Sequence, residues 1–375
     1  FRNTAVASVT IPGNYKTIYD NAFQDCSKLI SLIYQKSSVA YSDQVIKSRA
    51  FMNTRLTSVS LSSSLSLIEL CAFEDCTALT SIVIPEGVTE IGFAAFQNCS
   101  SLVSVKLPST LEKLGTTSRY DDGVFKKCIA LKSVAWAEGE SDAYIGTNTF
   151  MGCSALTEIS IPGNVENIYD SAFKDCTALT KFMYAKGLYG YANQNIYANV
   201  FSNNTALSKV YIPSTVGSIN EGAFTGCGAV TVYGKKGSTA ETFASKYVNL
   251  TFQEYDDDIS FTLDTTGVID SGKTLTLTAK GGVFYKFLIY NPSTNAWFCL
   301  RDYNTSNTFK WTSSGSGTRI LCVDIKDAYG NVTRLQQSIE VKQALGITAS
   351  SNKSSVVVGD IVKINAAASG GAGGY

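Results

Sequence analysis

Apolar positions recur along the first 250 residues of this chain with a period of about 23 residues. Each period opens on a Leu-x-x-Val/Ile-x-Ile segment and closes on Ala-Phe-x-x-Cys followed by a leucine, and residues 156–179 give the clearest copy. The alternation in the opening segment predicts a strand with one buried face. One such unit cannot bury its apolar side by itself, so the pattern predicts a repeat solenoid whose stacked turns share a core.

A phenylalanine marks the same point in every period. Successive copies are 22 to 29 residues apart, so several periods carry extra residues and the solenoid should have about nine turns. The anchor residues are Phe23, Phe51, Phe73, Phe96, Phe125, Phe150, Phe173, Phe201 and Phe224.

A cysteine usually follows the anchor phenylalanine by three positions. Thr54 and Asn204 replace it in two turns. We interpret this column as small buried residues whose polar atoms bind the backbone of the turns. Metal binding or redox chemistry is the alternative, although no Cys-x-x-Cys motif and no histidine accompany the column. The seven cysteines of the column are Cys26, Cys76, Cys99, Cys128, Cys153, Cys176 and Cys227.

The other three cysteines do not suggest disulfides. Cys71 lies outside the column, and we place Cys299 and Cys322 on strands that are not adjacent. We therefore expect mostly free thiols.

Ser-Val-x-Ile-Pro followed by Ala-Phe-x-x-Cys and leucine resembles the BspA-like leucine-rich repeats of bacterial cell-surface proteins, over about residues 5–252. The resemblance implies a right-handed leucine-rich-repeat solenoid. It also implies a secreted or surface-attached protein, and some members of the family are implicated in adhesion to host matrix proteins. Within residues 1–252, the segment 231–252 leaves the pattern but keeps apolar residues at helical spacing, which predicts a C-terminal cap.

After residue 252 the pattern changes to short alternating strands separated by Gly, Asn and Ser turns. Seven strands in 253–344 predict an all-β immunoglobulin-like sandwich. The segment 270–282 recurs at 358–371, so 345–375 should be the truncated start of a second such domain. We expect these domains to form a stalk, with direct ligand binding as the alternative. The predicted strands are Ile259–Leu263, Thr274–Ala279, Tyr285–Tyr290, Trp297–Asp302, Thr308–Trp311, Ile320–Lys326 and Thr333–Val341.

Composition excludes several classes of function. The chain has no histidine, which removes Ser-His-Asp and Cys-His catalysis and His-ligated metals. Its 31 basic and 31 acidic residues balance, so nucleic acid is a poor partner. No apolar run reaches the roughly 20 residues of a membrane span. We expect no cofactor or metal, and we expect a monomer that is located outside the cell. Because signal and anchor segments are missing, we expect the chain to be part of a longer protein.

Two acidic segments could supply oxygen ligands to calcium. Residues 254–258 and 121–123 carry the acids, but neither has the spacing of a known calcium loop. We interpret them as a solvated linker and a turn.

Two surfaces are candidates for ligand binding. On the predicted strands, one outward column runs from Ser8 to Lys209 and its neighbour from Thr10 to Tyr211, and both become bulkier toward the last turns. Longer turns at 35–49, 115–123, 137–148 and 185–199 should protrude from one side and carry tyrosines. The candidates are Lys181, Met183, Lys209 and Tyr211 on the strands and Tyr41, Tyr120, Tyr144, Tyr189, Tyr191 and Tyr197 in the turns.

These tyrosines suit protein hot spots and glycans alike, and the alternative is that they pack over their own loops. We expect a non-catalytic adhesion head that binds a host or matrix protein, with a glycan-binding module as the alternative. A glycosidase is the second alternative and would need two carboxylates roughly 5–9.5 Å apart. The acids available in the long turns are Asp121, Asp122, Glu138, Glu140 and Asp142.

Overall fold

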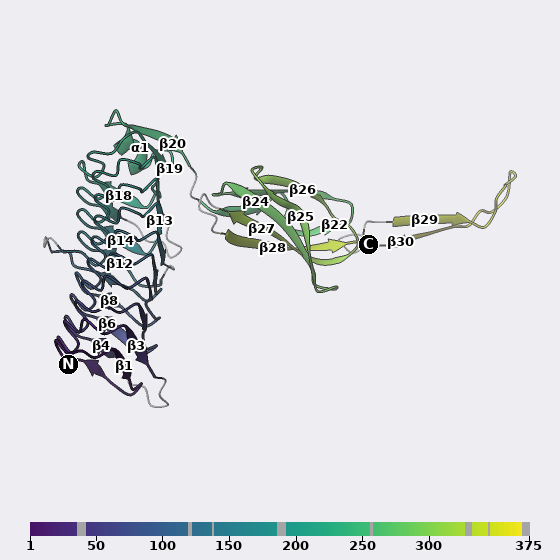
Figure 1. Ribbon diagram of the computed structural model, residues 1–375. Coiled ribbons are helices and arrows are strands. Elements are labelled where there is room, and N and C mark those ends of the chain that lie inside the picture. Colours follow the sequence, from purple (N-terminus) through teal and green to yellow (C-terminus); the bar gives the residue numbers. More distant parts are fainter. Residues whose placement is uncertain are drawn as a thin grey trace. The chain divides into compact units, whose positions relative to one another are not determined.

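The computed structural model describes residues 1–35, 43–118, 122–136, 139–185, 193–255, 258–326, 332–343 and 346–369 (Figure 1). The chain divides into two compact units, Phe1–Tyr255 and Asp256–Tyr375. Each unit has its own hydrophobic core.

The first unit is a stack of turns that each contribute two short parallel strands (Figure 1). The first strand of each turn is the one that the alternating pattern predicts. These strands form three sheets: β1 (Ser8–Ile11), β3 (Ser31–Tyr34) and β5 (Ser58–Ser60); β7 (Ser81–Val83), β9 (Ser104–Leu107) and β11 (Ser133–Trp136); and β13 (Glu158–Ile161), β15 (Lys181–Tyr184), β17 (Lys209–Tyr211), β19 (Val230–Gly234) and β20 (Leu250–Glu254).

The second strand of each turn was not expected from the sequence. It spans only two to four residues, which is too short to show an alternating pattern. Its isoleucine or leucine points into the core, and neighbouring turns pair in parallel into one nine-stranded sheet. The members are β2 (Thr17–Ile18), β4 (Gln44–Ile46), β6 (Leu65–Ile68), β8 (Glu90–Ile91), β10 (Lys113–Leu114), β12 (Ala143–Ile145), β14 (Val165–Ile168), β16 (Gln194–Ile196) and β18 (Val216–Ile219).

Strand pairing places equivalent repeat positions side by side. Ser8 pairs with Ser31 and Ser31 with Ser58, and the same register holds from Ser81 to Ser133 and from Glu158 to Lys209. The two predicted outward columns are therefore confirmed within each of the three sheets.

The nine anchor phenylalanines stack into one column inside the solenoid. Adjacent ring centroids lie 4.9 to 6.1 Å apart, and most neighbouring rings are within 15° of parallel. Phe51 through Phe201 have no exposed surface. Phe1 stacks on Phe23 at 5.4 Å and so extends the column by one ring. Because each ring contacts only the turns on either side, the core is built by neighbour contacts along the whole stack.

Around seven of the nine anchor phenylalanines, the residues two positions before and two positions after the ring both lie in the left-handed region, and around Phe125 and Phe224 only the second of them does. Ser171 and Asp175, two positions before and after Phe173, have φ values of 59° and 60°. Asn, Asp and Gly often fill these positions because they tolerate that conformation best. The second position also forms side-chain bonds between turns, such as Asn203 Nδ2 to Asp175 Oδ1 at 2.8 Å.

Six of the seven cysteines in the column are buried, as the sequence predicts, and Cys227 is half-buried. Their thiols bind the turn backbone. Cys153 Sγ donates to the Phe125 carbonyl oxygen at 3.2 Å, and Cys176 donates to that of Phe150 at 3.1 Å. Each donor thus satisfies the phenylalanine carbonyl of the preceding turn. Burial raises the pKa of Cys176 to about 12 and of Cys227 to about 11. The same bond recurs at Cys26, Cys76, Cys99, Cys128 and Cys227.

A short helix lies at the C-terminal end of the solenoid. This helix, α1 (Thr239–Ala244), buries Ala240, Phe243 and Ala244 against β18, β19 and β20. The Phe243 ring lies 5.8 Å from Phe224 and continues the aromatic column out of the last turn. Strand β20 pairs with β19 and is the last strand of its sheet.

The part of the second unit up to β28 contains eight strands in two sheets among the described residues, and all seven predicted segments form strands. The additional strand, β22 (Gly267–Asp270), pairs in parallel with β28 and lies in a segment that shows little alternation. One sheet contains β21 (Ser260–Leu263), β23 (Thr274–Lys280) and β26 (Thr308–Thr312). The other has the order β22, β28 (Val332–Lys342), β27 (Gly317–Lys326), β24 (Phe284–Asn291) and β25 (Ala296–Asn304).

Strand β24 separates the two cysteines of this unit. Leu288 on β24 pairs with Cys299 of β25 on one side and with Cys322 of β27 on the other. The expectation that these cysteines lie on non-adjacent strands is confirmed. Farther along the chain, β29 (Gly346–Ser351) and β30 (Ile364–Ser369) form a separate antiparallel pair.

The aromatic column makes a direct prediction for Phe173. This ring is fully buried between Phe150 at 5.2 Å and Phe201 at 6.1 Å. Replacing it with alanine opens a cavity, which we expect to cost about 3–5 kcal/mol of unfolding free energy. Urea denaturation followed by circular dichroism measures the loss. A variant that unfolds at the wild-type urea concentration would show that the repeat register is wrong.

The buried thiols predict a loss of stability at alkaline pH. Their pKa is higher in the folded protein than the ordinary value of 9.0, so the stability they contribute is complete below pH 9 and is lost as pH rises from 9 to about 12. Each thiol removes up to about 1.4 kcal/mol per pH unit in this window. Urea midpoints between pH 7 and 10.5 measure the fall.

A matched variant isolates the cysteines in that experiment. Cys153→Thr with Cys176→Thr follows the natural Thr54, whose hydroxyl donates to the Phe51 carbonyl at 2.9 Å. Its stability should fall less steeply above pH 9 than that of the wild type, and parallel curves would contradict the assignment. Thiol titration of unfolded, unreduced protein should detect most of the ten cysteines.

Candidate binding surface of the solenoid

The strand candidates lie in the last turns, and only part of them faces solvent. Lys209 is exposed and Lys181 is half-buried, whereas Met183 and Tyr211 retain 6% and 9% of their exposure. The expectation that all four form an open surface is therefore wrong for these two. The Tyr211 ring stacks on Tyr233 at 4.4 Å, and bulky neighbours in one column cover each other.

The long turns do not all occur at the same phase of the repeat. The segments at 35–49, 137–148 and 185–199 add residues between the first and second strands of a turn, whereas 115–123 adds them after the second strand β10. The four segments therefore do not share one insertion point, which the sequence did not reveal because the second strands could not be recognised in it. Most of the added residues lie outside the described residues. Tyr41, Tyr120, Tyr189 and Tyr191 lie outside the described residues.

The structure brings the remaining two candidates, Tyr144 and Tyr197, into one cluster through Tyr169. The Tyr169 and Tyr197 rings stack at 4.7 Å, and Tyr144 meets Tyr169 edge-on at 5.8 Å. These residues belong to or directly follow β12, β14 and β16, which are adjacent in the nine-stranded sheet. Tyr197 is 37% exposed, and the other two rings are half-buried.

Tyr169 was not selected from the sequence because its turn has the basic length. The signal that could have identified it is an Ile-Tyr pair whose tyrosine lies four residues before an anchor phenylalanine, which occurs at Tyr19, Tyr169 and Tyr197. Strand register shows that these tyrosines share one repeat position. In three intermediate turns that position is Gly92, Gly115 or Gly146.

The glycines leave room for the Tyr144 ring. A side chain at Gly146 would place its Cβ 2.5 Å from the Thr116 carbonyl oxygen, so the turns approach too closely there for any other residue. The Tyr144 hydroxyl lies 3.4 Å from the Gly115 carbonyl oxygen in the preceding turn.

Amide and hydroxyl groups lie beside the three rings. Asn195 Nδ2 donates to Asn167 Oδ1 at 3.0 Å, and the Ser218 hydroxyl donates to Asn195 Oδ1 at 2.6 Å. We call Tyr144, Tyr169, Tyr197, Asn167, Asn195 and Ser218 the tyrosine surface. Its side chains are uncharged, and burial raises the pKa of Tyr144 and of Tyr169. The phenols are therefore neutral hydrogen-bonding groups at physiological pH.

In three of the long turns an aromatic residue ends the first strand, and each of these residues is buried or half-buried. Tyr184 is 2% exposed and its hydroxyl donates to the Val165 carbonyl oxygen. Tyr34 is half-buried, and desolvation raises its pKa. Trp136 is half-buried too, and its Nε1 has no hydrogen-bond partner among the described residues.

The described residues suggest little for catalysis or metal binding. Asp121 and Glu138 lie outside them, and Asp122 accepts a bond from Gln97 Nε2 at 3.1 Å. In this part of the chain, no group of three or more Cys, Asp and Glu side chains is placed to hold a metal ion. None of its helices has the length and apolar character required to cross a membrane.

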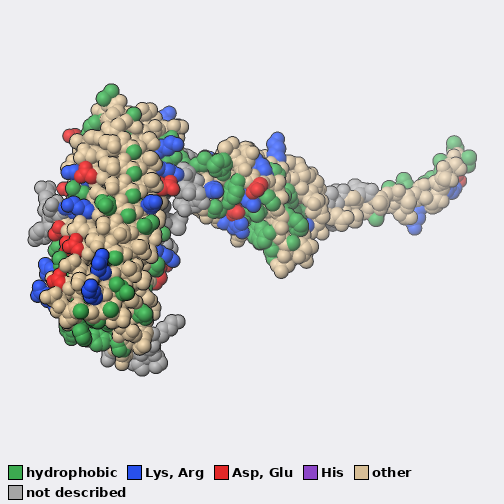
Figure 2. Space-filling model, viewed as in Figure 1, with side chains coloured by type: hydrophobic (Ala, Val, Ile, Leu, Met, Phe, Trp, Pro, Cys, Tyr) green, Lys and Arg blue, Asp and Glu red, His purple; other side chains and the backbone are tan. Residues whose placement is uncertain are grey.

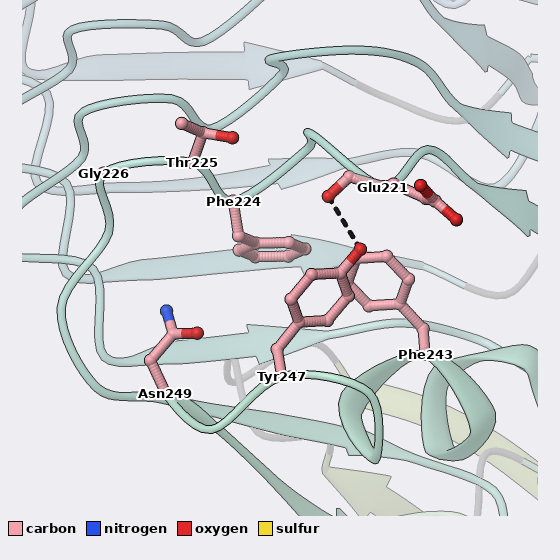
Figure 3. A pocket seen from close by; sticks show the side chains of 7 residues that line it. All are labelled: Glu221, Phe224, Thr225, Gly226, Phe243, Tyr247 and Asn249. Atoms are coloured by element: carbon pink, nitrogen blue, oxygen red, sulfur yellow. Dashed lines mark hydrogen bonds between the residues drawn. The ribbon is translucent and has the colours of Figure 1, made fainter.

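A small cavity lies between the last turn and α1 (Figure 3). It holds about 160 Å³, and the Tyr247 hydroxyl closes one side by donating to the Glu221 carbonyl oxygen at 2.9 Å. Sites for drug-sized ligands usually hold about 300–1,000 Å³. The cavity is lined by Glu221, Phe224, Thr225, Gly226, Phe243, Tyr247 and Asn249.

Comparison with known proteins identifies the repeat. A family model for the BspA-type leucine-rich repeat region matches residues 1–121, 44–180 and 117–231, more than half of the chain. No curated protein matches this chain.

Several solved structures are similar to the chain. A leucine-rich repeat protein from Bacteroides ovatus is 24% identical with a TM-score of 0.49, over 67% of this chain and 66% of that one. The pneumococcal vaccine antigen PcpA is 21% identical with a TM-score of 0.40, over 61% and 62%. A leucine-rich cell surface protein from Faecalibacterium prausnitzii is 23% identical with a TM-score of 0.34, over 63% and 62%. The chain thus spans slightly less than two thirds of each of these structures.

Proposed function

The chain belongs to the BspA-type leucine-rich-repeat family, and we propose that it is a non-catalytic binding protein of the bacterial cell surface whose solenoid contacts a protein partner. Leucine-rich repeats are generally protein-interaction modules. In this proposal the solenoid is an adhesion head for a host or matrix protein, and the protein acts as a monomer outside the cell.

The tyrosine surface is the observation that carries the proposal. Three rings from adjacent strands meet there, and each combines a large apolar face with a hydroxyl group. Tyrosines of this kind dominate the binding energy of many protein interfaces. Side chains of both charges are interspersed on the visible face of the solenoid, so no field of one sign directs the choice of partner there (Figure 2).

We also propose the domain organisation that the sequence suggested. In it, residues 1–252 form a solenoid of nine phenylalanine-centred turns with a cap at 231–252. Residues 253–344 form an immunoglobulin-like sandwich that serves as a stalk, and 345–375 begin a second module. The antiparallel sheets and the separate core of the second unit support this assignment.

Glycan binding is the alternative, and the amide groups of the tyrosine surface favour it. Asn167, Asn195 and Ser218 form a row of donors and acceptors next to the rings. Aromatic faces with planar amides at their side suit the apolar and hydroxyl faces of a neutral sugar.

Binding by separate units tests the assignment of roles. Residues 1–255 and 256–375 should first be shown to melt cooperatively, and then applied to immobilised matrix proteins and to a glycan array. We expect saturable binding to a matrix protein by the first fragment. Binding to glycans would support the alternative, and binding to a matrix protein only by the second fragment would refute the proposal.

Paired variants test the tyrosine surface itself. Tyr169→Ala with Tyr197→Ala removes two rings that are partly exposed, so we expect affinity to fall at least tenfold while the melting temperature changes by only a few degrees. Tyr19→Ala is the control, because Tyr19 occupies the same repeat position and is 68% exposed at the opposite end of the solenoid. Surface plasmon resonance measures both. Equal losses in the two variants would exclude a specific role for the cluster.

A further inference from the structure

The edge strand β25 of the second unit carries three exposed aromatic residues. Trp297 is 43% exposed, Phe298 53% and Tyr303 37%. Phe298 pairs with Ile289, whose side chain belongs to the core, so it lies on the inner side of the sheet. Trp297 pairs with Tyr290 on the opposite, outer face, with ring centroids 5.0 Å apart. A domain that acted only as a spacer would not need such residues on its outer surface.

An arginine on the same outer face, from the non-adjacent strand β28, reaches the tryptophan. Arg334 on β28 places its Cζ 5.2 Å from the Trp297 ring centre. Its Nε and Nη2 donate to the two carboxylate oxygens of Asp324 at 2.6 and 2.7 Å, and the Asp324 side chain is 8% exposed. The hydrogen bonds to Asp324 raise the pKa of Arg334. The guanidinium group is therefore held in one orientation over the Trp297 ring, and its Nη1 has no partner among the described residues.

The floor of this face is apolar. Leu288 and Cys322 point to the outer side of the sheet, yet they are 8% and 0% exposed. The outer face of an antiparallel sheet is commonly solvated. Here the long side chains from β25 and β28 cover the middle of it, which excludes water and strengthens electrostatic contacts made there.

Positive charge is in excess around the cluster. Lys286 and Lys326 lie 5.7 and 5.3 Å from the Tyr303 ring centre. Lys286 also pairs with Asp302 at 3.1 Å. Among the described residues, the group with Arg334 contains three cations against two carboxylates, Asp302 and Asp324, and the second of these is already bound by the arginine.

We propose that this outer face binds an acidic sugar residue. The apolar face of the sugar ring packs on the part of Trp297 that Arg334 and Tyr290 leave exposed, and its carboxylate accepts hydrogen bonds from the guanidinium N–H groups of Arg334 that Asp324 leaves free. A neutral sugar would use the ring but not the excess positive charge. The site is in the second unit, so it does not depend on the function proposed for the solenoid.

The test compares a charged ligand with an uncharged derivative of the same ligand. The full chain is titrated with a tetramer of galacturonic acid and, separately, with the methyl ester of the same tetramer. Tryptophan fluorescence reports binding, since Trp297 is one of three tryptophans. We expect saturable binding of the acid and at least tenfold weaker binding of the ester.

Variants assign the binding to this face. Trp297→Ala and Arg334→Gln should each weaken binding of the acid at least tenfold, as followed by isothermal titration calorimetry. Phe298→Ala is the matched control, because Phe298 is an exposed aromatic residue of the same strand on the other side of the sheet. It should bind like the wild type. Arg334→Lys keeps the positive charge but loses the bidentate contact to Asp324, so this variant should bind the acid with intermediate affinity. Partial binding by Arg334→Lys would show that the loss in Arg334→Gln does not come from misfolding alone.

Four outcomes would overturn the proposal. They are equal affinity for acid and ester, unchanged affinity in Trp297→Ala, loss of binding in the Tyr169→Ala, Tyr197→Ala variant instead, and no saturation at millimolar ligand. If the chain bound a matrix protein in a way that depends on Trp297 but did not bind the acid, the partner of this face would be a protein and not a sugar.

Discussion

The contact between one turn and the next is the constraint on which the solenoid depends. A turn of 22 to 29 residues has too little apolar surface to fold by itself, and its phenylalanine is buried only when another ring lies about 5 Å away on each side. The thiol of each cysteine column residue reaches the carbonyl oxygen of the phenylalanine one turn earlier. Packing and hydrogen bonding therefore link the same neighbours, which fixes the spacing of the turns.

This constraint explains what the sequence could predict. Interior positions must be filled by the same kind of residue in every turn, so the phenylalanine and cysteine columns were visible as repeats. The second strands were not visible, because two to four residues with one buried isoleucine produce no period of their own. The phase of the long turn at 115–123 was misassigned for the same reason.

The candidate site was harder to predict, because outward positions are not constrained by the stack. Tyr144 and Tyr197 could be selected because they lie in turns of unusual length, whereas Tyr169 occupies a turn of the basic length and gave no such signal. Met183 and Tyr211 show the opposite error. Alternation correctly placed them on the outward column, but it could not show that large neighbours in that column bury one another.

Outward columns also show how a repeat of this kind can change its surface while it keeps the same core. The residue after the second strand is tyrosine, lysine, glutamate or glycine in different turns, as Tyr19, Lys47, Glu69 and Gly92 show, and each of these turns still has its buried phenylalanine. Where glycine occurs, a neighbouring ring such as Tyr144 gains room to lie across the turn. Register then places substitutions in different turns about one strand spacing apart, roughly 4.8 Å, which is close enough for tyrosine rings to meet. A cluster such as Tyr144, Tyr169 and Tyr197 thus depends on surface positions and on the glycines next to Tyr144, while the phenylalanine column behind it remains the same.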